Sequence, residues 1–296
     1  MSELADKMKI LPTVFMLLVL LTSAKAGDVP VSTQPVTEIP LSTGTLYIPS
    51  AYRPDGDRTD IVMHFQGSPE VARDRFIESG RSAILIAIYY PGLSEEYGRP
   101  FRGTDLFRKI LGEASRHTAD HFGMKRVKIR RIVLSSFSAG YGSLREILKL
   151  KEYESLITDV ILADSLYAGY IKVKGRDAVN PDNMTSFVPL AKRAARGEVN
   201  MWVTYSSVVP PGYASTGETA DFLIKAVGAK KVPASGEDPP GLKLIAAADK
   251  GSFHVRGYAG DTGEEHMRHF HALDHWLART SLHLLPGAGP DTESQK

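Results

Sequence analysis

The sequence contains no cysteine among its 296 residues. Disulfide bridges, cysteine nucleophiles and thiolate metal sites are therefore excluded, and the fold has to be held by packing alone. The chain also lacks a strong excess of one charge, because its formal net charge is only +2. Nucleic-acid-binding domains are usually much more basic, so we expect no nucleic-acid partner.

Long apolar runs are absent beyond the amino-terminal residues. Lys7 and Lys9 precede an apolar stretch over 10–21, and Ala24-Lys25-Ala26 follows with small residues at the two positions that matter for cleavage. The stretch is short for a membrane span of about 20 residues, which leaves an uncleaved anchor as the alternative. We expect a signal peptide over 1–26 that is removed after Ala26, and a secreted or periplasmic protein with no membrane partner afterwards.

The remainder has the length of one large domain and shows no internal repeat. Residues 27–44 begin with a stretch rich in proline, threonine and serine, and we expect an extended lead-in there. We expect one domain over 45–285 and a flexible tail over 286–296. The segment 229–241 has the composition of a surface loop and gives no sign of a second domain.

Short apolar runs alternate with helical patterns along the domain. Strands bounded by turn residues and apolar on both faces are typical of a parallel sheet covered by helices on both sides, which predicts the α/β class. Two longer polar segments, 91–104 and 168–190, are expected to cap the carboxyl edge of the sheet. The expected strands are 60–65, 82–90, 131–135, 160–163, 201–206 and 242–247, and the expected helices are 71–79, 106–122, 141–150, 220–227 and 264–280.

The most informative stretch is Ile132–Leu144. An apolar run ends in Ser136-Phe137-Ser138-Ala139-Gly140, and a helical pattern follows. A serine on a sharp turn between a strand and a helix, with small neighbours, is the arrangement of a nucleophile elbow, usually G-x-S-x-G. Ser136 stands where the first glycine is usual. We expect Ser138 to be the nucleophile.

With this elbow, His64-Phe65-Gln66-Gly67 at the end of an earlier strand, and a late histidine before the last helix, the chain resembles the α/β-hydrolase superfamily over about residues 45–280. The resemblance implies an eight-stranded, mostly parallel sheet and a serine–acid–histidine triad in that chain order. It also implies an oxyanion hole built from the backbone N–H groups of Gln66 or Gly67 and of Ala139.

The position of the acid is less regular. In this fold the acid usually follows the strand expected at 201–206, but the loop 207–215 has no carboxylate. Asp164 ends the preceding strand and is our first choice on chain order and position. Its alternative role is that of a turn or helix cap. Glu218, later in the usual region, is the second candidate.

Two histidines follow the last expected strand. His266 comes after a glycine-bearing loop and opens the last expected helix, which is the usual position of the base, so we prefer it. His254 lies in a segment that has the pattern of a strand extension and is the alternative. With His269, His271 and His275 the helix carries four histidines, but H-E-x-x-H is absent. We expect a solvated helix face with scattered histidines, no metal and no cofactor.

These features predict a serine hydrolase that cleaves an ester of a carbohydrate, a lipid or a small molecule through an acyl-enzyme. Two other readings remain open: a catalytically silent binding protein on the same fold, for which the empty acid loop would be a sign of decay, and a serine peptidase or amidase. The sequence does not specify the oligomeric state.

Overall fold

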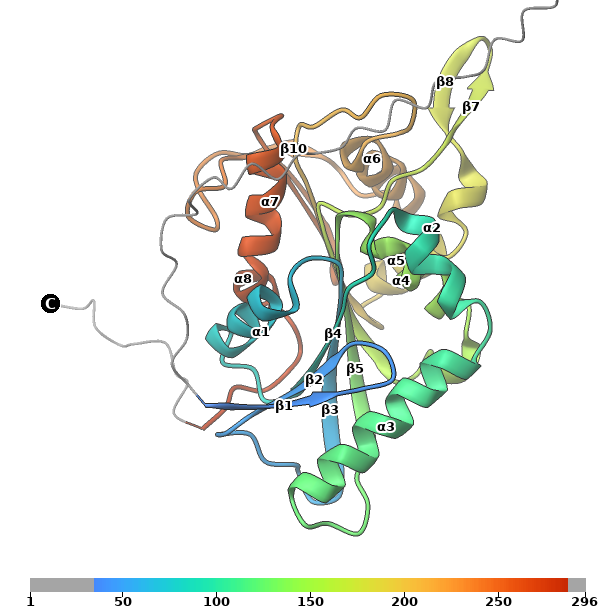
Figure 1. The fold of residues 1–296 in the computed structure, drawn as a ribbon. Helices are drawn as coiled ribbons and strands as arrows, with labels where there is room; N and C mark the ends of the chain where they lie inside the picture. Colours follow the sequence, from blue (N-terminus) through green and yellow to red (C-terminus); the bar gives the residue numbers. More distant parts are fainter. Residues whose placement is uncertain (1–34, 287–296) are drawn as a thin grey trace, which may run out of the picture. The chain divides into compact units, whose positions relative to one another are not determined.

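A ten-stranded sheet forms the centre of the computed structural model, which describes residues 35–286 (Figure 1). The expected signal peptide and nearly all of the expected tail lie outside these residues. The strands of the sheet run in the order β1-β2-β4-β3-β5-β6-β9-β12-β11-β10. They are β1 (Val36–Pro40), β2 (Thr45–Pro49), β3 (Arg58–Phe65), β4 (Ile84–Ile88), β5 (Lys128–Phe137), β6 (Ile157–Ala163), β9 (Asn200–Tyr205), β10 (Val232–Pro233), β11 (Leu244–Lys250) and β12 (Phe253–Tyr258).

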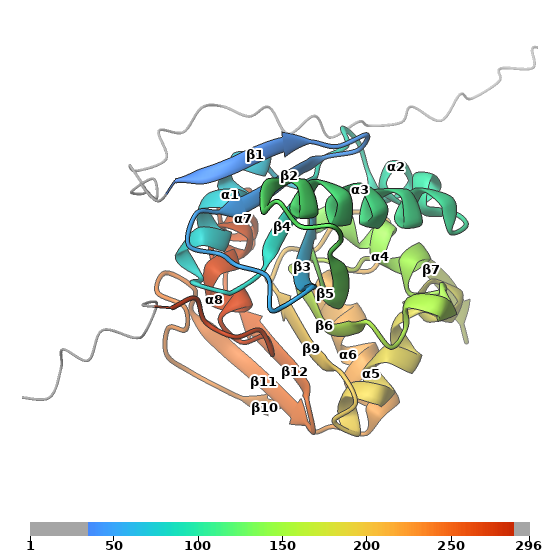
Figure 2. The same ribbon diagram turned by 90° about the horizontal axis from the view of Figure 1, so that it is seen from below.

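The six central strands, β4-β3-β5-β6-β9-β12, are parallel to one another. The outer strands β1 and β2 on one edge and β11 and β10 on the other pair antiparallel. Figure 2 shows the strands side by side from below. The predicted α/β class with a mostly parallel sheet is confirmed. The eight strands implied by the resemblance become ten within the described residues.

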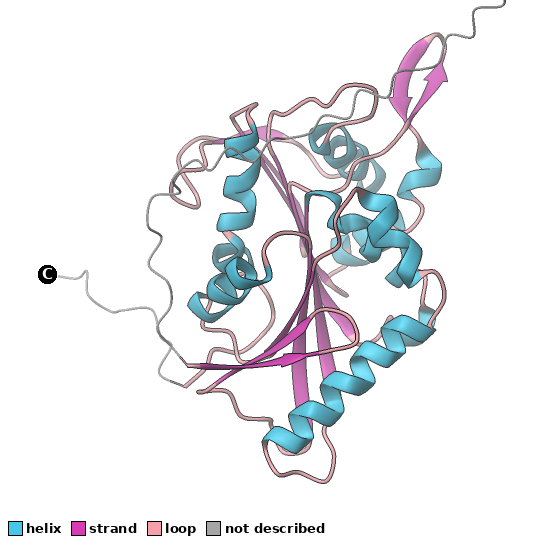
Figure 3. Ribbon diagram, viewed as in Figure 1, coloured by secondary structure: helices cyan, strands magenta, loops and turns pink. Residues whose placement is uncertain are grey.

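Helices cover both faces of this sheet (Figure 3). Alternate residues of β3 point to opposite faces, as the pleat requires, so Ile61 and Met63 join one buried cluster and Val62 joins the other. Helices α3 to α6 pack on the first cluster, and α1, α7 and α8 on the second. The helices are α1 (Pro69–Glu78), α2 (Ser94–Gly98), α3 (Asp105–His121), α4 (Tyr141–Ile147), α5 (Phe187–Ala195), α6 (Thr216–Val227), α7 (Gly263–His271) and α8 (Leu273–Leu277), with short 3₁₀ turns η1 (Arg99–Phe101), η2 (Ser138–Gly140), η3 (Lys151–Tyr153) and η4 (Pro181–Met184).

The carboxyl half differs from the sequence prediction at two places. The run expected as one strand with an extension is a hairpin, because Gly251 turns the chain between β11 and β12 with a φ of 56°. The parallel partner of β9 is therefore β12. The helix expected over 264–280 is broken at Ala272, where the indole N–H of Trp276 donates to the His269 carbonyl.

The segments expected at the sheet margins also have structure. β1 lies within the expected lead-in and pairs with β2, and β10 lies within the loop 229–241. The segment 91–104 contains α2 and η1. The segment 168–190 contains β7 (Tyr170–Val173) and β8 (Arg176–Val179), which form a separate two-stranded hairpin.

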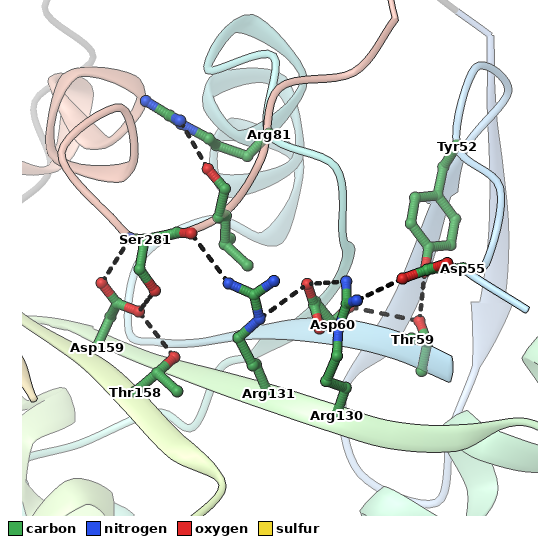
Figure 4. A network of polar contacts seen from close by, with 11 residues as sticks. Tyr52, Asp55, Thr59, Asp60, Arg81, Arg130, Arg131, Thr158, Asp159 and Ser281 are labelled. Carbon is green, nitrogen blue, oxygen red and sulfur yellow. Dashed lines mark hydrogen bonds and ion pairs between the residues drawn. The ribbon is translucent and has the colours of Figure 1, made fainter. Parts of the chain in front are cut away.

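A polar network holds the chain that follows α8 against the amino end of the sheet (Figure 4). The carboxylate of Asp159 on β6 accepts from the backbone N–H of Ser281 at 2.8 Å and from its hydroxyl at 2.6 Å. On β3, Asp60 accepts from Nε and Nη2 of Arg130 at 2.8 and 2.9 Å. Both aspartates are 1% exposed, so the protein supplies the hydrogen bonds that water would otherwise make.

Within residues 35–286, none of the helices is both long and apolar enough to span a bilayer.

Candidate active site

Ser138 lies directly after β5, where the chain turns through η2 into α4. Its φ of 46° is in the left-handed region, which is strained for a residue with a Cβ and is frequent at functional turns. Gly140 permits this turn, because a Cβ there would lie 2.2 Å from the Phe65 carbonyl oxygen at the end of β3. The strand, the sharp turn and the helix are thus present where the sequence predicts the elbow.

The serine that replaces the first glycine of the motif has a specific set of contacts. The Ser165 hydroxyl donates to the Ser138 carbonyl at 2.7 Å, so the Ser136 hydroxyl is the donor in its 2.9 Å hydrogen bond to Ser165. All three residues are at the carboxyl ends of β5 and β6. The pair therefore fastens the elbow to the neighbouring loop, a role that glycine cannot fill.

Asp164 follows β6 and is completely buried, with a φ of 42°. Its Oδ1 accepts from the Ser206 backbone N–H at 2.9 Å and from the Thr216 hydroxyl at 2.5 Å. Burial alone would raise the pKa of the Asp164 carboxyl. The neighbouring histidines and the hydrogen bonds outweigh burial and hold this pKa well below its ordinary value, so Asp164 is ionised at neutral pH.

The other carboxylate oxygen of Asp164 meets His266, the fourth residue of α7. His266 Nδ1 lies 2.6 Å from Asp164 Oδ2. An ionised carboxylate only accepts, so Nδ1 carries the proton and Nε2, on the opposite side of the ring, is left as the acceptor. The ring lies 4.5 Å from that of Phe137, the residue before Ser138. The imidazole is thereby held next to the elbow, with Nε2 as the nitrogen that is not engaged by Asp164.

The two alternative candidates have other partners. His254, on β12, pairs with Asp249 at 2.6 Å and stacks on Trp202 at a centroid distance of 4.4 Å. Glu218 accepts from the backbone N–H and hydroxyl of Ser215, both at 2.8 Å, and closes a capping box at the start of α6. Of the four residues proposed as acid or base, the structure brings together Asp164 and His266.

The loop after β3 has an unusual backbone. Gln66 and Gly67 both have positive φ values, 78° and 101°. The Gln66 N–H donates to the Ile88 carbonyl at 3.1 Å, so it continues the sheet. The Gln66 carbonyl accepts from His64 Nε2 at 2.8 Å, and Ser135 donates to Nδ1 of the same ring at 3.0 Å. Because a trans peptide points its C=O and N–H in opposite directions, the Gly67 N–H points away from the His64 ring.

Four rings connect this loop with the candidate base. His64 stacks on Phe270 at 5.4 Å, Phe270 stacks on Phe137 at 5.3 Å, and Phe137 contacts His266. Gly67 lies against the same Phe270 ring, since a Cβ there would approach it to 2.4 Å. The two aromatic side chains were not among the predicted site residues. Their only sequence signals are the positions of Phe137 before the serine and of Phe270 one helical turn after His266.

The predicted solvated histidine face of the last helix is wrong at His269, which is fully buried. Thr204 accepts the Asp164 backbone N–H at 3.0 Å and so directs its own hydrogen to His269 Nδ1 at 2.7 Å. Burial lowers the pKa of His269 to about 4, and it lowers the pKa of His64 to about 4 as well. Both imidazoles are neutral at pH 7; that of His64 donates and accepts, and that of His269 accepts from Thr204.

Strained residues gather at this edge of the sheet. Within the described part of the chain, five non-glycine residues have positive φ: Gln66, Ser138, Asp164, Leu166 and Lys174. The first four follow β3, β5 and β6 at their carboxyl ends, which is where α/β folds place their sites. Residues 35–286 contain no group of three or more acidic or histidine side chains arranged to hold a metal ion.

No protein-family model matches the sequence, and no curated protein matches it significantly. Among solved structures, the chain is similar to a feruloyl esterase module from Clostridium thermocellum in complex with sinapinate, with 11% identity and a TM-score of 0.47 over 84% of this chain and 90% of that one. It is also similar to carboxyl esterase 2 from the fungus Tuber melanosporum, with 10% identity and a TM-score of 0.44 over 86% and 88%. An α/β-hydrolase fold protein from Chitinophaga pinensis matches at 10% identity and a TM-score of 0.37 over 83% and 95%.

The fold follows from the molecule itself: a mostly parallel sheet covered on both faces, a serine on the strand–turn–helix after β5, and a histidine on the helix after the last parallel strand. The described chain has the α/β-hydrolase fold.

Proposed function

We propose that the protein is a serine hydrolase that cleaves a carboxylic ester, with Ser138 as nucleophile, His266 as base and Asp164 as the acid that orients it. The observation that carries the proposal is the 2.6 Å contact between His266 Nδ1 and an ionised, buried Asp164, beside a serine held in a strained turn. A hydroxyl is a poor nucleophile until an adjacent imidazole accepts its proton. The strain at Ser138 keeps its hydroxyl at the carboxyl edge, clear of the sheet.

The reaction has two halves. Ser138 Oγ attacks the ester carbonyl while its proton passes to His266 Nε2. The tetrahedral intermediate then collapses, the bond to the alcohol oxygen breaks, and His266 returns the proton to the departing alcohol. Water repeats the sequence on the acyl-enzyme and releases the carboxylic acid. Asp164 keeps the imidazole in the required tautomer and stabilises its positive charge in both halves.

The negative oxygen of the intermediate needs donors that are already in place. We assign the N–H groups of Gly67 and Ala139, and we prefer Gly67 to Gln66 because the Gln66 N–H is used by Ile88. His64 supports this assignment by fixing the carbonyl of the same peptide. Each such donor contributes about 3–4 kcal/mol to transition-state stabilisation in hydrolases where one has been removed.

A fluorophosphonate probe tests the assignment directly, since it reacts only with an activated serine. The wild-type protein should be labelled at Ser138 and should hydrolyse simple acetyl esters. Ser138→Ala should lose the labelling and about 10⁴-fold or more of the turnover while melting at an unchanged temperature. Ser186→Ala, at the start of α5, is the matched control and should keep the labelling and turnover of the wild type, although it loses a hydrogen bond to the Arg145 carbonyl.

Labelling at another residue, or near-normal turnover by Ser138→Ala, would remove Ser138 from the mechanism. An unlabelled and inactive wild-type protein with the expected melting transition would instead support the silent binding protein. Comparing an ester with the amide of the same acid then separates an esterase from a peptidase or amidase.

We also propose that the protein is exported, on the basis of the amino-terminal pattern in residues 1–26. Sequencing of the protein recovered from the medium or periplasm should begin at Gly27. Recovery in the membrane fraction alone, with Met1 retained, would contradict removal of the segment.

A further inference from the structure

Three tyrosine rings lie in succession beside the candidate active site. Tyr141 and Tyr167 have their ring centroids 6.1 Å apart, and Tyr167 and Tyr213 have theirs 5.6 Å apart in an edge-to-face arrangement. We call these three residues the tyrosine wall. They come from α4, from the loop after β6 and from the loop between β9 and α6, so three segments distant in sequence contribute one ring each.

The tyrosine wall starts at the groups assigned to catalysis. Tyr141 is three residues after Ser138 at the first turn of α4, and Tyr167 is three residues after Asp164. The negative charge of Asp164 is close enough to contribute, after burial, to the raised pKa of Tyr167. A molecule that presents its ester to Ser138 therefore lies within reach of these rings.

The segments that carry the wall are fixed to one another. The Ala214 N–H donates to the Ala168 carbonyl at 2.7 Å, one residue from Tyr213 and one from Tyr167. The Tyr141 hydroxyl donates to Ser94 at 3.0 Å, which ties the ring to the start of α2. Such rings are held before any ligand arrives, which reduces the entropy that binding costs.

Exposure rises along the wall away from the core. Tyr141 is only 7% exposed, whereas Tyr213 is 42% exposed. The neighbouring loops carry Leu93 and Val209, which are 74% and 73% exposed. Exposed apolar groups that gather at one edge of a protein are a common feature of binding sites.

The chemistry of these loops distinguishes between possible ligands. The loop 207–215 contains no charged residue, and the one cation recorded against a ring of the wall in the described residues is Arg145, 5.9 Å from the centroid of the Tyr141 ring. Sugars bind largely through hydrogen bonds to charged and amide side chains, and the loop 207–215 has neither. Aromatic rings instead gain from edge-to-face and offset contacts beyond the area that they bury, whereas a saturated ring of the same size does not.

We propose that the tyrosine wall binds an aromatic ring of the substrate, so that the protein acts on esters with an aryl group in their acyl or alcohol part. This inference rests on the proposed hydrolase function. It names a substrate class for that function, and Tyr213 is its most accessible determinant.

The test compares esters that differ only in the ring. Methyl 3-phenylpropanoate and methyl 3-cyclohexylpropanoate have equally reactive carbonyls, as do benzyl acetate and cyclohexylmethyl acetate. In at least one pair, kcat/KM should favour the phenyl compound by about 3- to 10-fold. Tyr213→Leu should abolish this preference, and Tyr213→Phe should retain it because the ring remains.

Tyr89→Leu is the matched control. Tyr89 is also exposed, but it follows β4, which lies two strands from β5 on the side opposite to β6 and β9. Tyr89→Leu should leave the ratio of kcat/KM for the phenyl and cyclohexyl esters unchanged. Equal turnover within both pairs, or a preference that survives Tyr213→Leu, would overturn the proposal.

A binding measurement keeps the two proposals separable. Ligand-observed NMR titration of Ser138→Ala with benzyl acetate and cyclohexylmethyl acetate should show weaker binding of the saturated compound. If neither ester is cleaved by the wild type and no serine is labelled, the hydrolase proposal fails, and the titration still decides whether the wall selects aromatic rings. Equal binding of the two compounds would refute the proposal that the tyrosine wall selects aromatic rings, whatever the outcome for the hydrolase proposal.

Discussion

Strand β6 carries one buried aspartate near its amino end and another just beyond its carboxyl end. Asp159 accepts hydrogen bonds from four donors on Thr158, Asn200 and Ser281, and none of these donors titrates. Asp164 accepts from two neutral donors and from a histidine whose side chain is 19% exposed. Burial and satisfied hydrogen bonds are common to both ends of the strand. What distinguishes the carboxyl end is an ionisable partner that is accessible to solvent.

The backbone shows the same difference. Ser138, Asp164 and Gln66 hold positive φ angles at the carboxyl end, whereas no non-glycine residue of the described chain does so near Asp60 and Asp159. Strain of this kind costs about 1–3 kcal/mol per residue and persists where the surrounding structure enforces it. The amino-end network is one that holds the fold together, and the carboxyl-end cluster has the composition expected of a reacting site.

The largest effect is expected when one carboxylate oxygen of Asp164 is replaced by nitrogen, and the same replacement at Asp159 is the comparison. Asp164→Asn keeps the acceptor for Ser206 and Thr216 but presents an N–H₂ donor to His266, which favours the wrong tautomer. Ester turnover should fall by about 10⁴-fold, as in other triads, with little change in melting temperature. Asp159→Asn is the matched control, since hydroxyl donors rotate to accept, and should keep turnover within about 3-fold of wild type.

If Asp159→Asn abolished turnover as well, the distinction between the two ends would fail. A retained activity in Asp164→Asn would instead remove Asp164 from the orienting role.

A smaller effect, on stability and not on chemistry, is expected at Asp60. Asp60→Ala removes the carboxylate that pairs with Arg130 and Arg131, leaving Arg130 with Asp55 as its remaining acidic partner. Because both arginines are 20–26% exposed, solvent compensates them in part, and the free energy of unfolding should fall by about 2–3 kcal/mol. Urea denaturation measures this change. At temperatures where the variant is folded, its kcat/KM should equal that of wild type, and a selective loss of kcat would contradict a purely structural role.

A third effect is a pH dependence of stability from the two buried imidazoles. The pKa values of His64 and His269 are lowered to about 4, below the ordinary value of about 6.5 that they regain on unfolding. The unfolded chain therefore binds more protons between these limits, and stability falls as the pH decreases from about 6.5 to 4, by up to about 1.4 kcal/mol per pH unit for each histidine. The lowered pKa of Asp164 acts in a separate window, below about pH 4.

Urea midpoints at several pH values test this directly. His64→Gln retains side-chain hydrogen bonding but does not titrate. The slope of the unfolding free energy against pH between pH 6.5 and 5, which counts the protons taken up on unfolding, should therefore decrease by about one proton. An unchanged slope would show that His64 is protonated in the folded protein.

The sequence allowed prediction of the parts of the site that are local in the chain. The elbow around Ser138 could be recognised because a strand, a turn and a helix follow one another within a dozen residues, and the strand endings at Phe65 and Ala163 marked the loops with Gln66 and Asp164. What could not be predicted depends on packing between distant segments. The burial of His269 needs Thr204 beside it, and the ring contacts of Phe137 need Phe270.

The hairpin of β11 and β12 illustrates a different limit. Only Gly251 and Ser252 separate the two strands, so the sequence pattern predicts the second strand as an extension of the first. A turn signal was present in Lys250-Gly251-Ser252, but it is weak without knowledge of the neighbouring Ala195 carbonyl, to which a Cβ at position 251 would come within 2.5 Å.

The chain that follows α8 sets a limit on how far the gene can be shortened. A stop codon after Thr280 would keep every residue assigned to catalysis and the whole of the last helix. It would also remove both groups of Ser281 that bind Asp159, the Leu282 carbonyl that accepts from Arg81, and the backbone pairing of Ser82 with His283 and of Leu285 with Gly80. For recombinant production, the smallest useful fragment therefore extends through Leu285, although nothing in the chemistry of the site requires those last five residues.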